Sequence, residues 1–323
     1  MAELELKVTL VKDLTANVKM FEFVAANGGD LPRFAAGAHI EIKTGSGVRS
    51  YSLANNPNER HRYVTAILRE PAGKGGSRWM HETIKPGITL KASEPIQNFP
   101  LIESADKTLL LGGGIGITPL LSMSHRLIQL GADFHLYYCT RAKEETAFYD
   151  EVKALLGDKV TFYHDGGDVS KGINLKQVFG SRPHNAHLYV CGPAGLLNAA
   201  RNVTSHWSPE SVHFELFASS KTEEDRAADA AKVNAAFEVE LAQSGVTFTI
   251  PADRSILDVL LDNGYGVPYA CEDGWCGACT ITLISGKADH RDEFLSDADK
   301  AANEKIQVCI SRAMPGEKLV LDM

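Results

Sequence analysis

The 323-residue sequence predicts a multidomain protein in which an antiparallel β-barrel, an α/β domain with a parallel sheet and a smaller α+β domain follow one another. Three observations predict this order. The first hundred residues hold short strand-like runs and few helical ones. From Lys107 onward apolar strands alternate with helices. After a polar stretch the chain resumes with strands, one helix and a loop rich in cysteine.

The barrel is predicted over residues 1–104. Its strands are indicated by short alternating or apolar runs that glycine-rich turns separate. The strand-like runs are Leu6–Leu10, Lys19–Val24, His39–Lys43 and Tyr63–Leu68, and the turns are residues 27–30 and 45–47. Many short strands with few helices favour a barrel.

The α/β domain is predicted over residues 105–218, because apolar strands and helices alternate there, as in a parallel sheet. The expected strands are Thr108–Leu111, Phe134–Cys139, Val160–Tyr163, His187–Cys191 and Ser211–Phe217. The expected helices are Pro119–Leu130, Glu145–Leu156 and Ala194–His206.

Residues 219–236 are polar, charged and small, which predicts a linker. The last domain is predicted over residues 237–323, with a helix at Ser255–Asn263. From residue 235 onward the chain has 15 Asp and Glu against 7 Lys and Arg, so this part carries the whole net charge of −8. An acidic surface can steer a partner, although it also simply keeps a protein soluble. No basic patch is present, and we expect no binding to nucleic acid.

The cysteines near the C-terminus carry the clearest chemical signal. Cys271, Cys276 and Cys279 follow the pattern C-x4-C-x2-C, and Cys309 stands alone further on. This is the ligand spacing of a plant-type [2Fe–2S] cluster. Glycines inside the loop let the backbone approach the cluster. Because such a centre passes single electrons, the sequence predicts an electron-transfer protein.

Other uses of these cysteines are weaker. Cys276-x-x-Cys279 alone resembles a thioredoxin-like pair, but that motif lacks the flanking cysteines. Zinc also accepts four thiolates, yet structural zinc sites usually combine two short cysteine knuckles. The spacing therefore favours the cluster over zinc, and zinc over disulfides. Cys139 and Cys191 lie in apolar runs, and we expect them to be buried and reduced.

Two motifs in the barrel suit a phosphate. Arg49-Ser50-Tyr51-Ser52 combines a fork-shaped cation, two hydroxyl groups and a flat aromatic ring. Residues 73–77, which include Gly75, Gly76 and Ser77, precede a predicted helix at Ser77–Ile84, whose N-terminus favours an anion. Each motif has a plain alternative, a surface arginine or a flexible loop with Ser77 as N-cap. Together they favour a flavin phosphate.

Residues 112–119, Gly-Gly-Gly-Ile-Gly-Ile-Thr-Pro, follow a strand and open a helix, like the first βα turn of a nucleotide-binding sheet. Thr118 can cap that helix and Pro119 suits its first position. The run is not the fingerprint G-x-G-x-x-G, and a packing turn without a ligand is the alternative. Cys191-Gly192-Pro193 ends another strand, so we expect it to line the same crevice. Cys191 has no evident histidine partner for nucleophilic chemistry.

These motifs, in this order and over the whole chain, resemble the reductase components of Rieske-type oxygenases, the family of phthalate dioxygenase reductase and vanillate O-demethylase reductase. The resemblance implies a ferredoxin–NADP reductase-like flavin barrel, a pyridine-nucleotide domain and a C-terminal plant-type ferredoxin domain. It implies metal ligands at Cys271, Cys276, Cys279 and Cys309.

The resemblance also implies roles for single residues. Arg49 and Ser77, with Gly75 and Gly76, would hold the flavin phosphate, and Ser50, Tyr51 and Ser52 would contact the flavin, Ser52 near its reactive N5. The NADH site would comprise Gly113, Gly114, Gly116, Thr118, Arg141, Cys191, Gly192 and Pro193. Phe217 would stack on the flavin. Ser52, Cys191 and Phe217 would thus lie nearest the chemistry.

The implied activity is electron transfer from NADH through a flavin and the [2Fe–2S] cluster to a terminal Rieske-type aromatic oxygenase. A ferredoxin domain at the C-terminus favours FMN over FAD in this family. A reductase serving another acceptor, such as a cytochrome or a ferredoxin, and a non-enzymatic iron–sulfur sensor are the alternatives. With no signal peptide and no long apolar run, we expect a cytoplasmic monomer that does not enter a membrane.

Replacing Cys276 by serine should remove or severely destabilise the cluster, because the residue lies in the ligand loop. Flavin content should survive, since the barrel is a separate domain. Cys139→Ser should leave the iron content unchanged. Iron analysis and visible spectra of the two variants test this, and a Cys276 variant with full iron would show that the ligand assignment is wrong.

Overall fold

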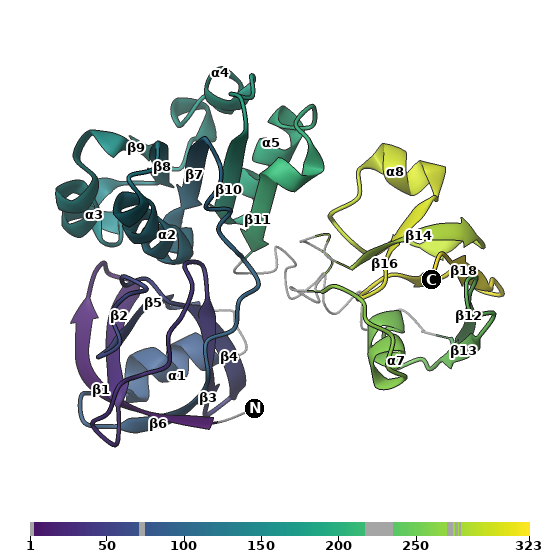
Figure 1. The fold of residues 1–323 in the computed structure, drawn as a ribbon, viewed down its shortest axis with the longest axis horizontal. Helices are drawn as coiled ribbons and strands as arrows, with labels where there is room; N and C mark the ends of the chain where they lie inside the picture. The colour runs from purple at the N-terminus through teal and green to yellow at the C-terminus, as the bar shows by residue number, and fades with distance from the viewer. Residues whose placement is uncertain (1–2, 71–74, 217–234, 270–273, 275–276, 278) are drawn as a thin grey trace. The chain divides into compact units, whose positions relative to one another are not determined.

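The computed structural model describes residues 3–70, 75–216, 235–269, 274, 277 and 279–323 (Figure 1). The chain divides into two compact units, Met1–Ala218 and Ser219–Met323. The division falls where the sequence turns polar. None of the described helices is long and apolar enough to cross a membrane.

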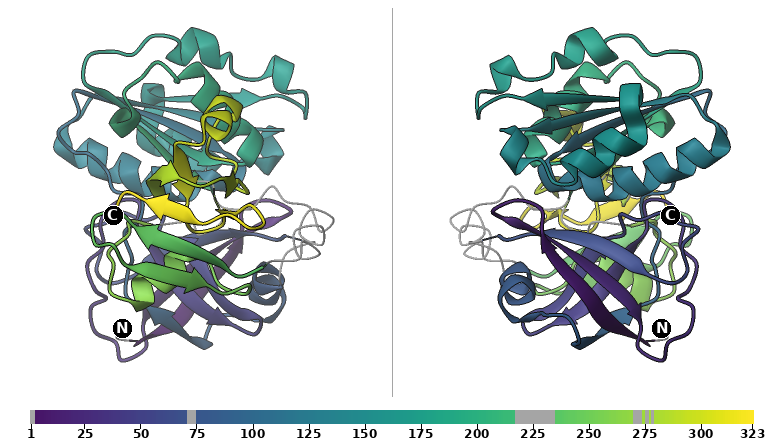
Figure 2. Two further views of the ribbon diagram at one scale, coloured as in Figure 1. Left: turned by 90° about the vertical axis from the view of Figure 1, so that its right-hand side faces the viewer. Right: turned by 90° about the vertical axis from the view of Figure 1, so that its left-hand side faces the viewer.

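The first unit begins with a six-stranded antiparallel sheet in the order β4-β3-β6-β1-β2-β5 (Figure 2). Its strands are β1 (Glu3–Asp13), β2 (Val18–Ala25), β3 (His39–Thr44), β4 (Gly47–Ser52), β5 (Tyr63–Leu68) and β6 (Thr89–Ser93). The end strands meet, because the Thr65 hydroxyl donates to the Ser52 carbonyl at 2.8 Å. The sheet therefore curls into the predicted barrel.

The barrel interior is filled by alternate side chains of these strands and by Met80 from helix α1 (Gly76–Thr83). The largest fully buried members are Phe21, Phe23, Ile40 and Ile42, together with Tyr63, whose hydroxyl donates to Pro32 O. Successive side chains of a strand point to opposite faces of the sheet, so every second side chain enters the barrel interior. Strands β4 and β6 are absent from the sequence prediction: β4 is mostly polar, while β6 alternates in polarity over only five residues.

The rest of the first unit is a five-stranded sheet in the order β11-β10-β7-β8-β9. Its strands are β7 (Lys107–Gly113), β8 (Phe134–Thr140), β9 (Val160–His164), β10 (Ala186–Gly192) and β11 (Val212–Leu216). All four neighbouring pairs are parallel, as predicted. The chain winds outward from β7 in both directions, so β7 and β10 flank the topological switch point.

Helices cover both faces of this sheet. Helices α2 (Ile117–Leu130) and α3 (Tyr149–Leu156) pack on one face, with Leu110, Leu136 and Tyr189. Helices α4 (Leu175–Phe179) and α5 (Ala194–Val203) pack on the other, with Leu109 and Val190. Successive side chains of β7 and β10 point to opposite faces of the sheet, so these strands contribute to the apolar core on each face.

The helix predicted over Glu145–Leu156 is too long, because α3 starts at Tyr149. Residue Phe148 is buried and has a left-handed backbone with φ 59°, which a continuous helix cannot contain. The helix predicted over Ala194–His206 likewise ends early, at Val203. Burial of an aromatic side chain outweighs helical propensity at Phe148.

The second unit is a mixed five-stranded sheet in the order β13-β12-β18-β14-β16 (Figure 1). Its elements are β12 (Phe237–Leu241), β13 (Thr247–Ile250), α7 (Ile256–Asp262), β14 (Thr280–Ser285), β15 (Ala288–Asp289), α8 (Asp297–Ala302), β16 (Lys305–Gln307), β17 (Arg312–Ala313) and β18 (Leu319–Leu321). Only β12 and β18 pair in parallel within this sheet. Ser255 caps α7 with a capping box, and this explains why the helix was predictable.

A buried arginine ties this unit together. Arg312 is 6% exposed, and its guanidinium donates to the carbonyls of Arg254, Pro251 and Ala235 at 2.7, 2.8 and 3.2 Å. It also stacks on the ring of Phe237. Desolvation lowers the pKa of Arg312. The residue fixes the start of the unit to the segment that follows Cys309.

Arg312→Met should lower the stability of the second unit by about 2–4 kcal/mol, because buried carbonyls lose their donors. In scanning calorimetry, the unfolding transition of the second unit should move to a lower temperature, while that of the first unit should keep its temperature. Arg254→Met is the matched control: its ion pair with Asp262 is solvent-exposed, so we expect a change of about 0.5 kcal/mol or less. Equal effects of both variants would contradict the anchoring role.

Candidate functional site

The motif Arg49-Ser50-Tyr51-Ser52 lies on β4, antiparallel to β3. The Tyr51 hydroxyl is buried and has no hydrogen-bond partner among the described residues. Burial raises the pKa of Tyr51 to about 12. A buried hydroxyl without a partner is costly, so it indicates a polar ligand that the protein expects at this place.

The structure brings the two barrel motifs together. A Cβ on Gly76 would lie 2.6 Å from Arg49 Cγ, so the start of α1 packs directly against the arginine stem. The Arg49 guanidinium itself donates to the carbonyls of Val48 and Ser46. The adjacent hydroxyl, fork-shaped cation and helix start fit a flavin phosphate and its attached chain.

The helix at this motif starts earlier than predicted. Gly75 is the N-cap, with φ 87°, and α1 begins at Gly76 rather than Ser77. Ser77 is not the cap; its hydroxyl oxygen accepts from Glu70 N–H at 3.0 Å. That bond uses a lone pair of the hydroxyl and leaves the proton available for an acceptor. Gly73 and Lys74 lie outside the described residues.

The two predicted turns of the nucleotide domain meet at the carboxyl ends of β7 and β10. A Cβ on Gly116 would lie 2.1 Å from Cys191 O, and one on Gly113 would lie 2.7 Å from Pro193 Cδ. Gly192 and Gly113 also approach backbone to backbone, with a Gly192 Cβ 3.0 Å from Gly113 Cα. The two turns expected to line one crevice are therefore in close backbone contact.

Thr118 does not cap α2 as predicted. A 3₁₀ turn at Gly114–Gly116 runs directly into the helix, so Gly116 is the N-cap and Pro119 is the third helical residue. The Thr118 hydroxyl donates to Ile115 O at 3.1 Å instead. The helix therefore presents the backbone N–H groups of the glycine turn, which suits a pyrophosphate.

Cys191 is fully buried, and its Sγ lies 3.8 Å from Glu215 Oε2 on the neighbouring strand β11. Desolvation raises the pKa of Cys191 well above its ordinary value, so this cysteine is a neutral thiol. Glu215 is half-buried as a residue, but its carboxyl group faces the buried thiol. Desolvation there raises the pKa of Glu215 to about 8, against a smaller opposite effect of the Cys191 hydrogen bond.

Sequence reasoning missed Glu215. A carboxylate inside the apolar run His213-Phe214-Glu215-Leu216-Phe217 was the available signal, because a charged residue on a sheet strand needs a reason. Phe217, the residue expected to stack on the flavin, lies outside the described residues.

Arg141 follows β8, and its carbonyl accepts from Gly166 N–H at 2.8 Å in the turn after β9. The carboxyl ends of β8 and β9 therefore lie side by side. Lys143 Nζ lies 4.5 Å from the centre of the Tyr149 ring, which holds this cation to the protein. Arg141 is exposed at the same edge as the glycine turns.

Two of the four predicted metal ligands are described. Cys279 and Cys309 are 2% and 8% exposed, while Cys271 and Cys276 lie outside the described residues. The loop glycines Gly274 and Gly277 both have φ 76°, and a Cβ on Gly277 would overlap the Phe294 ring. Two buried thiols beside a loop of left-handed glycines fit the donor set of a [2Fe–2S] cluster. Cys139 and Cys191 belong to the other unit, and burial raises the pKa of Cys139 to about 12.

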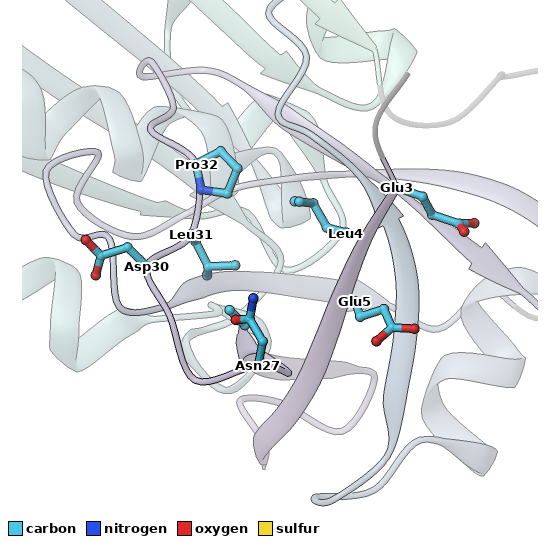
Figure 3. Close-up of a pocket in the computed structure, with 8 residues that line it drawn as sticks. Glu3, Leu4, Glu5, Asn27, Asp30, Leu31 and Pro32 are labelled. Atoms are coloured by element: carbon cyan, nitrogen blue, oxygen red, sulfur yellow. The ribbon is translucent and has the colours of Figure 1, made fainter.

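A pocket of about 270 Å³ lies elsewhere, on the barrel surface beside β1 (Figure 3). Two of its three carboxylates form ion pairs: Glu3 pairs with Lys91 at 2.6 Å and Asp30 with Arg60 at 3.2 Å. No predicted site residue lines it. We assign it no role.

The raised pKa of Glu215 has a measurable consequence. Because the folded protein holds this proton more tightly than the unfolded chain, the contribution of Glu215 to stability is present at low pH and is lost between about pH 4.5 and about pH 8. In the Glu215→Gln variant, the melting temperature should therefore fall less steeply than in the wild type between about pH 4.5 and about pH 8. Glu210→Gln is the control, since the Ser208 hydrogen bond lowers the pKa of Glu210 and its effect belongs to acidic pH. Parallel curves for Glu215→Gln and wild type would contradict the assignment.

Comparison with known proteins identifies two of the domains. Residues 239–314 match the model of the 2Fe-2S iron-sulfur cluster binding domain, and residues 110–202 match that of the oxidoreductase NAD-binding domain. Phthalate dioxygenase reductase of Burkholderia cepacia is 41% identical over 99% of this chain and 97% of its own length. The reductase subunit of tert-butanol monooxygenase / tert-amyl alcohol desaturase of Aquincola tertiaricarbonis is 38% identical over 99% and 96%.

Two solved structures add the architecture. That of phthalate dioxygenase reductase, described as a modular structure for electron transfer from pyridine nucleotides to [2Fe–2S], matches with a TM-score of 0.69 and covers 100% of this chain and 98% of that one. An intact type IV self-sufficient cytochrome P450 monooxygenase matches with a TM-score of 0.71 at 31% identity, over 99% of this chain and 41% of that longer chain.

The relatives that match the chain over its whole length, the two matched domains and the barrel that precedes them all indicate the same family. The chain belongs to the phthalate dioxygenase reductase family, the reductase components of oxygenases that combine an oxidoreductase NAD-binding domain with a [2Fe–2S] domain.

Proposed function

We propose that this chain draws electrons from NADH into its barrel and delivers them singly, through its C-terminal unit, to a Rieske-type oxygenase that acts on an aromatic substrate. The observation that carries the proposal is the presence of two sites in the first unit: Tyr51, Arg49 and Gly76 in the barrel, and the two glycine turns of the parallel sheet. When bound, FMN takes up electrons in pairs and gives them up singly, and the [2Fe–2S] cluster accepts them one at a time.

The chain's own residues bind and orient in this scheme. Arg49 and the Ser77 hydroxyl proton hold the flavin phosphate, and Tyr51 Oη finds in the flavin the partner that it otherwise lacks. Ser50 completes that contact, and Ser52 lies near the reactive N5. The residues proposed for NADH are Gly113, Gly114, Gly116, Thr118, Arg141, Cys191, Gly192 and Pro193.

Cys191 and Glu215 act as neutral groups at neutral pH, because burial raises the pKa of both. They place no negative charge where electrons arrive, which favours hydride transfer. Phe217, which lies outside the described residues, is the residue that would stack on the flavin. Cys271, Cys276, Cys279 and Cys309 hold the cluster.

The proposed functional modules are residues 1–104 for the flavin, 105–218 for NADH and 237–323 for the cluster, with 219–236 as the linker. We propose a monomer in the cytoplasm. Relatives named for phthalate and for tert-butanol share this arrangement. The choice of substrate therefore resides in the oxygenase, and this chain selects only the electron donor and the partner.

Anaerobic stopped-flow absorbance tests the scheme. NADH should bleach the flavin first and the cluster second, and the purified oxygenase should then be reduced. Heat release followed by mass measurement should identify FMN, and FAD would refute that assignment. Tyr51→Phe should weaken flavin binding about 5- to 10-fold through one lost hydrogen bond. Bleaching of the cluster without prior reduction of the flavin would contradict the order of transfer.

A second acceptor is suggested by the P450 structure, in which a segment similar to this whole chain forms part of one longer polypeptide. The proposed alternative is a cytochrome as the acceptor. Reduction rates of a purified Rieske oxygenase and of a bacterial cytochrome P450, measured side by side, decide between the two.

We predict that NADH is preferred over NADPH by at least about tenfold in kcat/KM, or about 1.4 kcal/mol. Asp165 follows β9 beside the end of β8, and Glu144 and Glu145 come shortly after β8 in the sequence. The 2′-phosphate of NADPH would therefore meet negative charge. Lys143 is engaged with Tyr149. Initial rates with cytochrome c as acceptor measure the ratio, and equal values for the two nucleotides would refute it.

A further inference from the structure

The C-terminal unit contains a buried carboxylate away from the cysteines themselves. Asp292 is 2% exposed. Its Oδ2 accepts from Leu295 N–H at 2.8 Å, and its Oδ1 accepts from the Ser311 hydroxyl at 3.2 Å. Burying a carboxylate is expensive, so two directed donors indicate a specific use.

Asp292 touches both segments that carry the proposed cluster ligands. A Cβ on Gly274, which lies in the loop between Cys271 and Cys276, would be 3.0 Å from Asp292 Cα and 2.7 Å from Ile310 Cγ2. Glu293 N–H donates to Gly274 O at 3.1 Å. The ligand loop therefore rests on the Asp292 segment.

The second tie runs to the distant ligand. Ser311, which donates to Asp292, is two residues beyond Cys309, and its hydroxyl oxygen accepts from Arg291 N–H at 3.2 Å. Ser311 N–H in turn donates to the carbonyl of Gln307, the last residue of β16, and the turn that follows Gln307 contains Cys309. The Asp292 segment thus contacts Gly274 on one side and the segment of Cys309 on the other.

A buried histidine accompanies the carboxylate. The His290 side chain is 8% exposed, and its Nδ1 lies 3.8 Å from Asp292 Oδ1, beyond hydrogen-bond length. Neither ring nitrogen has a hydrogen-bond partner among the described residues. Among the described residues, the Asp292 carboxylate therefore accepts its hydrogen bonds from Leu295 and Ser311, and the Asp292 carbonyl accepts one from Lys300 Nζ.

We propose that Asp292 is a positioning residue for the [2Fe–2S] centre. Its carboxylate fixes Ser311, two residues beyond Cys309, to the segment whose backbone contacts Gly274 through the Glu293 N–H, and so sets Gly274 against the segment of Cys309. The proposal rests on the cluster assignment made above. Partners of metal ligands commonly change metal retention when they are replaced, by about 10- to 100-fold. The carboxylate is required for its two acceptor positions, which no apolar residue supplies.

The test uses the full-length holoprotein and compares iron release to a chelator with the electron paramagnetic resonance spectrum of the reduced cluster. Asp292→Ala should release iron about 10-fold faster and shift the g values. Asp292→Asn should retain iron, because its amide can accept from Leu295 and donate to Ser311 Oγ. It should raise the reduction potential, because a negative charge is removed near a centre that gains an electron. Ser311→Ala, which breaks one tie, should be intermediate and tests the idea if Asp292→Ala does not fold.

Asp299→Ala is the matched control. Asp299 is also a carboxylate of this unit that accepts a backbone hydrogen bond, in the capping box of α8, so its loss should lower the melting temperature only. The proposal is overturned if Asp292→Ala keeps wild-type iron release and g values, or if Asp299→Ala changes them equally. A wild-type protein without a [2Fe–2S] spectrum would instead refute the proposed function.

Discussion

The close approach of two backbone turns at the switch point is the constraint on which the first unit depends. Gly116 lies against the Cys191 carbonyl, and Gly113 lies against Gly192 and Pro193, so any side chain at these positions would separate β7 from β10. This contact lets two strand ends and one helix start face the same crevice. The nucleotide site is thus a consequence of sheet topology combined with three glycines.

The barrel meets a different requirement, which is to hold a large polar ligand next to an apolar core. Tyr51 lies on a strand whose neighbours fill the barrel, yet its hydroxyl has no partner among the described residues. Arg49 and the start of α1 supply positive charge and backbone donors beside it. In the proposed function, binding of the flavin would therefore also complete the hydrogen bonding of Tyr51.

The C-terminal unit uses buried polar residues as ties. Arg312 binds three carbonyls at the start of the unit, and Asp292 joins the ligand loop to the last ligand segment. Both lie close in sequence or in space to Cys309. A small domain with few helices and short strands gains a defined ligand geometry from such directed contacts, which apolar packing alone does not supply.

The sequence by itself determined the three-part architecture, the parallel sheet and the family, because these depend on local periodicity, glycine turns and cysteine spacing. It also placed the two glycine turns in one crevice, since strand ends in a parallel sheet share an edge. Only the tertiary structure decided that Gly116 rather than Thr118 caps α2, that Phe148 shortens α3, and that Glu215 pairs with Cys191. These features depend on neighbours distant in sequence. The Cys191 carbonyl lies against Gly116, and the Phe148 ring is buried in the core. The Cys191 thiol lies beside the desolvated carboxyl group of Glu215 on the adjacent strand.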